Sequence, residues 1–324
     1  MAPAKIYHED AIRQAVQLDL SAIDRVEQAF SALASGQVTL PPVQSMTMPE
    51  HNGEVDIKSA YSPVFANFVV KIAAGFFDNP KRGLPSGSGL MVALSATTGQ
   101  VAAVLMDNGY LTDVRTAAAG GVAARHLAAA GARQVAVIGA GAQARLQLQA
   151  VHLVRPLQAA QIWARDPQKA AAAAAELTQT MGIPVSVSQS AEAAVGSAQI
   201  IVTTTPASTP LVMADWLQPG QLVIAMGSDH AHKAELEPEC LRRADCYVPD
   251  RQSQTAIAGE LRAALDAGVI AADAKFSELG EVIAGMARGR RSDEELIICD
   301  LTGTGIQDTA IADLALGRLR SDGD

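Results

Sequence analysis

The sequence of 324 residues has few cysteines, few aromatic side chains and no long apolar run. Its three cysteines are odd in number and lack metal-ligand spacing, which argues against a disulfide framework and predicts reduced thiols. Residues 1–10 lack the apolar core of a signal peptide, and no apolar stretch approaches the roughly 18 residues of a membrane span. The sequence therefore predicts a cytoplasmic protein without a membrane segment.

Positive charge is also in short supply. The chain has 25 lysines and arginines against 34 aspartates and glutamates, which gives a net charge of −9. This balance argues against nucleic acid or an anionic membrane as a general partner, so basic residues that matter should act locally, inside a pocket. No cysteine or carboxylate stands at ligand spacing from His230 and His232, so no metal site is predicted.

The most informative motif present is a β-branched apolar run that meets a glycine-rich turn. Val135–Ile138 is followed by Gly139-Ala140-Gly141-Ala142-Gln143-Ala144, and residues 144–154 have the pattern of a helix. This matches the strand, phosphate loop and helix start of a dinucleotide-binding unit. Gly139 allows the tight turn, and Gly141 lets the backbone approach a pyrophosphate on the helix N-terminus. Strand and helix patterns alternate afterwards, so a nucleotide cofactor is predicted.

Hydrophobic periodicity divides the chain into two regions. Residues 19–35 predict a helix, and the strands of an antiparallel or mixed sheet are expected at 55–61, 68–74, 89–95 and 100–106. A helix over 112–130 leads into alternating elements that predict a parallel, doubly wound sheet. Its further strands are expected at 161–164, 185–187, 199–204, 221–226, 246–248 and 295–299, with helices over 167–181, near Ala191, around Glu239 and over 255–267. A final helix over 308–319 should return to the first region.

Two cations break the local rules of their segments. Lys71 lies in an apolar strand, where it either occupies an exposed face or meets a substrate carboxylate. Arg115 is expected in the first turn of a helix, where the helix dipole disfavours a cation. It either pairs with Asp113 or holds a carboxylate through two hydrogen bonds.

Acidic residues raise a similar choice. Asp229 follows a strand at the edge where ligands bind in open α/β sheets, and it is either a helix cap or a group for proton transfer, as His230 and His232 could be. Asp56 and Lys58 share a strand face, which is most simply a solvated ion pair.

Two loops bear on ligand binding. Leu301–Gly305 is a second glycine-rich loop, which fits closure over a substrate better than a second phosphate site because no further β-α unit follows it. The second strand of the nucleotide unit ends at Arg165 and Asp166. Arginine there suits the 2′-phosphate of NADP, whereas Asp166 could bind the ribose of NAD or start a helix before Pro167.

Together these segments resemble the ornithine cyclodeaminase/mu-crystallin family over essentially the whole chain. The matching blocks are Val70–Ile72, Leu111–Ala118, Gly139–Ala144 and Met226–Asp229 with Lys233–Leu236. Within the family, Gly75–Pro80 and Asp107–Tyr110 are most similar to cyclodeaminase-like proteins associated with ectoine utilisation.

The resemblance implies a two-domain α/β fold. A Rossmann-type NAD(P)-binding domain over 113–305 would join a smaller mixed α+β domain, residues 1–112 with 306–324, that binds substrate and forms a homodimer. Lys71 and Arg115 would grip the substrate α-carboxylate, Asp229 would be the general acid/base, and Asp56 a second acidic group of the active site. Thr302 falls at a substrate contact. The implied nucleotide contacts are Ser86, Thr116, Gly139, Ala140, Gly141, Ala142, Gln143, Ala144, Arg165, Thr204, Thr205, Met226, Gly227, Ser228, Lys233 and Leu301.

Two departures from the family pattern suggest a substrate other than ornithine. Gln44 stands where a carboxylate-binding arginine is frequent, and Lys58 stands where methionine is common. We count both among the substrate-binding candidates, with Lys58 recognising a second acidic or polar group.

Three functions follow from the resemblance. In imine reduction, which the changed pocket favours, Lys71 and Arg115 would fix an α-imino carboxylate against reduced NAD or NADP while Asp229 supplies a proton. In cyclodeamination, NAD+ would oxidise the α-amine, a terminal amine would attack, ammonia would leave and the hydride would return. The third is small-molecule binding without catalysis. The polar pocket and Asp229 argue against it, because tight binding of an apolar ligand needs more aromatic lining.

Overall fold

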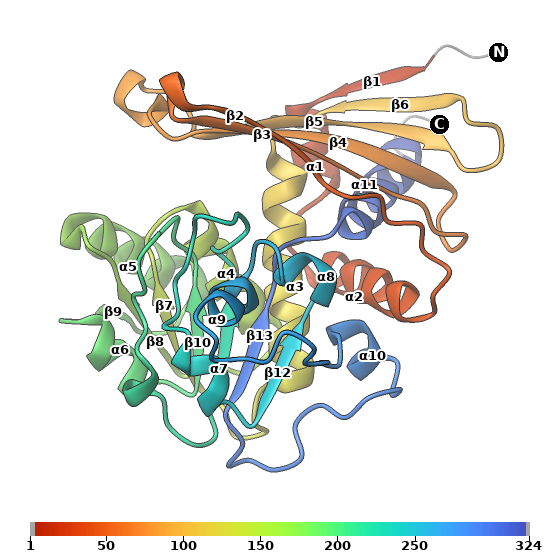
Figure 1. Ribbon diagram of the computed structural model, residues 1–324. Coiled ribbons are helices and arrows are strands. Elements are labelled where there is room, and N and C mark those ends of the chain that lie inside the picture. Colours follow the sequence, from red (N-terminus) through yellow and green to blue (C-terminus); the bar gives the residue numbers. More distant parts are fainter. Residues whose placement is uncertain (1–3, 322–324) are drawn as a thin grey trace. The chain divides into compact units, whose positions relative to one another are not determined.

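The computed structural model describes residues 4–321 (Figure 1). The chain forms two compact units. The first unit is built from residues up to Arg115 and from Thr304 onward, and the second unit is Thr116–Gly303. No helix within 4–321 is long and apolar enough to cross a membrane.

The first unit contains a six-stranded sheet in the order β1-β6-β5-β4-β3-β2. Its β1 runs parallel to β6 and all other neighbours are antiparallel, so the sheet is mixed. The strands are β1 (Lys5–His8), β2 (Gln44–Met48), β3 (Gly53–Ala60), β4 (Asn67–Phe76), β5 (Gly87–Ser95) and β6 (Val101–Met106). The sequence pattern missed β1 and β2, since β1 has four residues and prolines flank β2.

Helices cover one face of this sheet (Figure 1). They are α1 (Glu9–Ala15), α2 (Leu20–Ala34) and α11 (Gly305–Ser321). The α2 helix starts where Asp19 accepts the Ala22 amide hydrogen, and its Ile23 and Phe30 are fully buried. The α11 helix packs on β3, β4 and α2, so the last helix does return to the first region.

The other face of the sheet is largely apolar. Ile72 of β4 lies directly opposite Ile57 and Leu90 on the neighbouring strands, and cross-strand partners share a face. Its side chain is 38% exposed, and Ile6, Met46 and Met106 on the same face are exposed as well. No helix among the described residues of the first unit packs there (Figure 1).

The division of the chain after Arg115 falls within α3 (Tyr110–Leu127). This helix starts two residues before the predicted helix because Asp107 accepts a hydrogen bond from the Leu111 amide at 2.8 Å. Arg115 is therefore in the second turn, and its expected place in the first turn was wrong.

The second unit contains a seven-stranded parallel sheet in the order β12-β13-β11-β10-β7-β8-β9, which confirms the doubly wound fold. Strand order reverses beside β7, the position at which such sheets bind ligands. The strands are β7 (Gln134–Ile138), β8 (Ala159–Trp163), β9 (Val185–Val187), β10 (Ile200–Thr203), β11 (Leu222–Ala225), β12 (Cys246–Pro249) and β13 (Ile297–Asp300). Every residue of the central strands β10 and β11 is buried, because both faces of a parallel sheet are covered and apolar side chains fill both.

The helices of the second unit are α4 (Ala142–Val154), α5 (Pro167–Met181), α6 (Ala191–Ser197), α7 (Glu239–Arg243), α8 (Gln252–Thr255), α9 (Glu260–Asp266) and α10 (Leu279–Ile283). The predicted helix over 255–267 was wrong in extent. It breaks after α8, and α9 starts where the Asp300 carboxylate accepts from the Leu261 amide at 3.2 Å. The pattern also missed the short α10.

Candidate functional site

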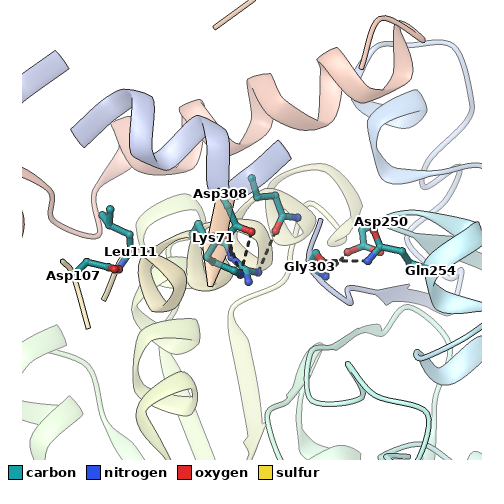
Figure 2. Close-up of polar contacts among 9 residues, drawn as sticks. Lys71, Asp107, Leu111, Asp250, Gln254, Gly303 and Asp308 are labelled. Carbon is teal, nitrogen blue, oxygen red and sulfur yellow. Dashed lines mark hydrogen bonds and ion pairs between the residues drawn. The ribbon is translucent and has the colours of Figure 1, made fainter. Parts of the chain in front are cut away.

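A buried ion cluster in the first unit brings two predicted residues together. Lys71 of β4 is 2% exposed, and its Nζ lies 3.0 Å from Asp308 Oδ2. Arg115 Nε lies 2.9 Å from Asp308 Oδ1, and its Nη1 donates to Gln307 Oε1 at 3.2 Å. Figure 2 shows the side chains of Lys71 and Asp308 pointing toward each other. The exposed-face alternative for Lys71 was therefore wrong.

Lys58 belongs to the same cluster. It lies directly opposite Lys71 in the pairing of β3 with β4, and it is 7% exposed rather than solvated. Asp56, two residues earlier on the same face, accepts a hydrogen bond from Ser45 Oγ at 2.6 Å. The solvated setting expected for this pair is therefore wrong for Lys58.

The cluster changes the protonation of its members. Burial, together with the charges of Arg115 and Lys58, outweighs the opposing effect of Asp308 and lowers the pKa of Lys71 from 10.5 to about 7. Burial would raise the pKa of Asp308, but Lys71, Arg115 and Lys58 outweigh it and hold this pKa below its ordinary value. Three basic side chains therefore lie around one carboxylate, and the cluster attracts a further anion when Lys71 is protonated.

Two predicted residues of the first unit lie outside the cluster. Gln44 begins β2 with an exposed side chain opposite Ile57, so it stands on the other face of the sheet from Lys71. Ser86 is exposed just before β5, and its carbonyl accepts from the Phe76 amide at 2.8 Å.

The glycine-rich turn of the second unit joins β7 to α4. Gly139 has φ +128°, and a Cβ there would lie 2.4 Å from Thr204 Oγ1, so only glycine fits. Gly141 and Ala142 are exposed at the start of α4, where the main-chain amides have no acceptor within the helix itself, and Ala144 is buried. Arg145 Nη1 donates to the Ala140 carbonyl at 2.7 Å. The turn can therefore hold a phosphate, with Gln143 in the first turn of the helix.

At the end of β8, Asp166 caps α5. Its Oδ1 accepts from the amides of Gln168 and Lys169 at 3.0 and 3.2 Å. Arg165 is exposed beside it. The helix start considered for Asp166 is therefore confirmed, and its use as a ribose ligand stays a prediction.

Several predicted nucleotide contacts follow the adjacent strands β10 and β11. They are Thr204, Thr205, Met226, Gly227 and Ser228. The Met226 amide donates to the Thr203 carbonyl at 3.1 Å, which continues the pairing past the strands. These segments and the glycine turn lie at the carboxyl ends of neighbouring strands, the edge at which nucleotides bind.

Asp229 comes next and caps no helix, because the following helix, α7, starts at Glu239. The cap alternative was wrong. Its Oδ1 lies 2.7 Å from the Nζ of buried Lys233, and the Asp229 side chain remains 40% exposed. The rings of His230 and His232 face each other nearby, with centroids 5.9 Å apart.

The loop with Leu301 and Thr302 is held by a residue that the sequence reasoning missed. Asp250 Oδ2 accepts from the Gly303 amide at 2.7 Å, and its Oδ1 accepts from Thr302 Oγ1 at 3.1 Å. Figure 2 shows Asp250 beside Gly303, with Gln254 bonding the same turn. Among residues 4–321, no three His, Cys, Asp or Glu side chains are grouped to hold a metal ion.

Asp308 was also missed as a site residue. The available signal was the succession Gln307-Asp308-Thr309 between apolar residues at the start of the last helix. All three are fully buried, and polar residues bury there only with partners.

Comparison with known proteins gives full-length matches. An uncharacterized cyclodeaminase of Sinorhizobium fredii is 54% identical over 98% of this chain and 96% of its own length. An alanine dehydrogenase of Archaeoglobus fulgidus is 36% identical over 95% and 92% of the two chains.

Solved structures match the fold equally fully. The Thermococcus litoralis Δ1-pyrroline-2-carboxylate reductase in complex with NADH and L-proline superposes with a TM-score of 0.94, covering 98% of each chain at 28% identity. An archaeal alanine dehydrogenase dimer with bound NAD has a TM-score of 0.91, covering 99% and 97% at 31% identity. A lysine cyclodeaminase structure has a TM-score of 0.90, covering 100% and 94% at 26% identity.

The ornithine cyclodeaminase/mu-crystallin family profile matches residues 5–323. The chain therefore belongs to the ornithine cyclodeaminase/mu-crystallin family.

Proposed function

We propose that this protein is an NAD(P)-dependent reductase of an α-imino acid, acting on its C–N bond. The observation that carries the proposal is the burial of Lys71 and Arg115 around Asp308, which leaves positive charge in excess. A planar guanidinium and an ammonium side by side suit a carboxylate. A family whose named members include a pyrroline-2-carboxylate reductase supports the same chemistry.

In this proposal Lys71 and Arg115 bind the substrate α-carboxylate and orient the imine. Lys58, buried next to Lys71, binds a second acidic or polar group of the substrate. Gln44 lies on the opposite face of the sheet from Lys71, which does not support its proposed contact with the substrate. Thr302, fixed by Asp250, contacts the substrate.

The nucleotide is proposed to bind the second unit, with the pyrophosphate at Gly139–Ala144. A Cβ at Gly139 would fill the space against Thr204, and this close packing of glycine backbone fits a dinucleotide turn. When bound, the nicotinamide supplies the hydride. Arg165 is exposed at the end of β8 and Asp166 is engaged in capping, which favours NADP. The Thermococcus litoralis reductase and the archaeal alanine dehydrogenase structures, in contrast, hold NADH and NAD.

Asp229 is proposed as the general acid that holds the proton for the imine nitrogen. Its exposed carboxyl can exchange protons with solvent, and Lys233 fixes one oxygen at 2.7 Å. Asp56, held by Ser45, is proposed as the second acidic group.

The functional assembly is proposed to be a homodimer through the apolar sheet face that includes Ile72. A second copy would bury this face, and an archaeal relative is described as a dimer. A cytoplasmic location and a role in ectoine utilisation remain predictions. The prediction about ectoine rests on Gly75–Pro80, at the end of β4 and in the turn after it, and on Asp107–Tyr110, at the start of α3.

One spectrophotometric experiment tests the function. The protein is mixed with NADH or NADPH and with α-keto acids plus ammonia or methylamine, or with cyclic imines such as pyrroline-2-carboxylate. Net loss of reduced cofactor is expected and identifies the preferred nucleotide. Ornithine, lysine and diaminobutyrate with oxidised cofactor form the second arm, in which ammonia release without net cofactor change would make the protein a cyclodeaminase instead. The absence of any reaction in both arms would favour small-molecule binding without catalysis.

Lys58→Met should lower activity toward dicarboxylic imines more than toward monocarboxylic ones.

A further inference from the structure

Two buried carboxylates of the second unit, Glu235 and Glu260, have no role in the proposal above. Their side chains are 0% and 1% exposed. A carboxylate loses hydration free energy on burial, so it is retained only where hydrogen bonds replace the lost water. The groups that they bind therefore indicate what they do.

Glu235 connects the ends of two neighbouring strands. Its Oε1 accepts from the Thr205 amide at 2.5 Å, and its Oε2 accepts from the Gly227 amide at 2.8 Å and from Thr203 Oγ1 at 2.6 Å. Thr205 follows β10 and Gly227 follows β11, which are paired in parallel. One side chain thus fixes the spacing of both strand ends by binding their main chains.

The packing at Gly227 leaves no space for a side chain. A Cβ there would lie 2.1 Å from the Thr205 carbonyl oxygen and 2.5 Å from Glu235 Oε2. The main chains of the two strand ends therefore touch each other and the carboxylate directly, which requires glycine.

Glu260 of α9 holds the main chain of the segment that carries Glu235. Its Oε1 accepts from the Glu235 amide at 2.9 Å and from the Ser228 hydroxyl, and its Oε2 accepts from the Leu236 amide at 3.2 Å. Burial, and then the Glu260 charge, raise the pKa of Glu235 to about 7. Carboxylates perturbed in this way are concentrated at functional sites.

We propose that Glu235 is a positioning residue for the nicotinamide nucleotide, which it serves by tying Thr205 to Gly227. Glu260 holds the segment that carries Glu235 and orients Ser228. The inference rests on the proposed function, which places the nucleotide at these strand ends. Because both carboxylates are buried, their effect passes through the main chain of the binding segments.

The variant Glu235→Gln tests this role because it keeps the size of the side chain. An amide has one acceptor oxygen and an NH2 group that only donates, so whichever way it turns, the amide of Thr205 or of Gly227 loses its acceptor. The dissociation constant for NADH or NADPH, measured by nucleotide fluorescence on the full chain, should rise about tenfold. The KM for the imino acid should stay unchanged, while the KM for the nucleotide rises.

Gln221 provides a matched control. It is buried immediately before β11, where its Nε2 donates to the carbonyls of Val195 and Ala198 at 2.8 Å each. Gln221→Met should lower the melting temperature at least as much as Glu235→Gln while leaving nucleotide affinity unchanged. Thr203→Val, which spares both main-chain bonds, should weaken binding by less than about threefold.

The outcomes distinguish the positioning role of Glu235 from the proposed function of the protein. Wild-type affinity in Glu235→Gln, or an equal loss of affinity in Gln221→Met, would overturn the positioning role while the proposed function stands. A wild-type protein that binds neither NADH nor NADPH would overturn the proposed function, and the positioning role with it.

Discussion

Lys71 owes its chemistry to its surroundings. In an open strand it would keep the ordinary lysine pKa of 10.5, but burial and the neighbouring Arg115 and Lys58 lower this pKa to about 7. Such a lysine changes charge near neutral pH, so its ability to hold a carboxylate depends on pH. Binding of an anion favours the charged form and draws a proton onto the side chain.

Lys71 predicts the pH dependence of turnover. The protonated form binds the substrate carboxylate, so kcat/KM for the imino acid should fall as pH rises through about 7, the pKa of the free enzyme. In Lys71→Arg the guanidinium stays charged, and this fall should disappear even if the maximal rate is lower. Steady-state kinetics from pH 6 to 9 measure both profiles. An identical fall in the variant would assign the titration to another group.

The same lowered pKa affects stability in the opposite direction. Between about pH 7 and 10.5 the unfolded chain binds more protons at this lysine than the folded chain does. The Lys71 contribution to the free energy of unfolding therefore rises with pH across that window.

Asp308 is predicted to hold the cluster together. Asp308→Asn leaves Lys71 and Arg115 buried without a counter-charge and should lower the free energy of unfolding by about 3 kcal/mol. Asp313 on the same helix pairs with Arg25 at 2.9 Å in a more exposed setting, so Asp313→Asn should cost about 1 kcal/mol or less. Urea titration followed by circular dichroism measures both. Equal losses of unfolding free energy in the two variants would show that the buried cluster contributes no more to stability than the exposed pair.

At the scale of elements, the turn between β7 and α4 is determined by its backbone. Gly139 combines a positive φ with contact against Thr204, which a side chain would disrupt. The turn is also braced by Arg145, whose guanidinium binds the Ala140 carbonyl. The element thus presents exposed amides at a fixed place on the sheet edge.

Gly139→Ala should weaken nucleotide binding. The added Cβ must displace Thr204, so the dissociation constant for the nucleotide should rise at least tenfold, or about 1.4 kcal/mol. Gly182, the C-cap of α5, also has a positive φ but nothing within 4 Å of its Cβ position. Gly182→Ala should therefore cost about 1 kcal/mol of stability without changing affinity. Equal affinity in the two variants, measured by fluorescence titration, would contradict the assignment of the turn.

At the scale of the whole molecule, the apolar face of the first-unit sheet stands out, because helices cover only the opposite face (Figure 1). Ile72 lies within this face with its neighbours Ile57 and Leu90. A contiguous apolar face of this kind on a described unit indicates an interaction surface.

Ile72→Glu should dissociate the proposed homodimer. Symmetry places the change on both subunits, and two carboxylates would have to be buried in one apolar interface. Light scattering coupled to gel filtration should find a dimer for the wild type and a monomer for the variant. Val64→Glu, an exposed apolar position in the loop between β3 and β4, is the control and should remain dimeric. A wild-type monomer would contradict the proposed assembly.

Local patterns predicted the elements that carry their own signals. The Val135–Ala144 turn, the parallel alternation after it and the helix over 19–35 all appear in the structure, because periodicity and glycine placement act over a few residues. Boundaries were less well predicted where a distant side chain sets them, as Asp300 does for the start of α9.

The sequence by itself determined the doubly wound sheet, its glycine turn and the unusual lysine within β4. Only the tertiary structure decided what that lysine meets. Asp308 lies 237 residues further along the chain, and its pairing with Lys71 arises from the packing of α11 on β4. Glu235 likewise depends on the pairing of β10 with β11, since its partners are main-chain amides without a sequence signature. Charge pairing over such separations is a product of packing, which no local pattern encodes.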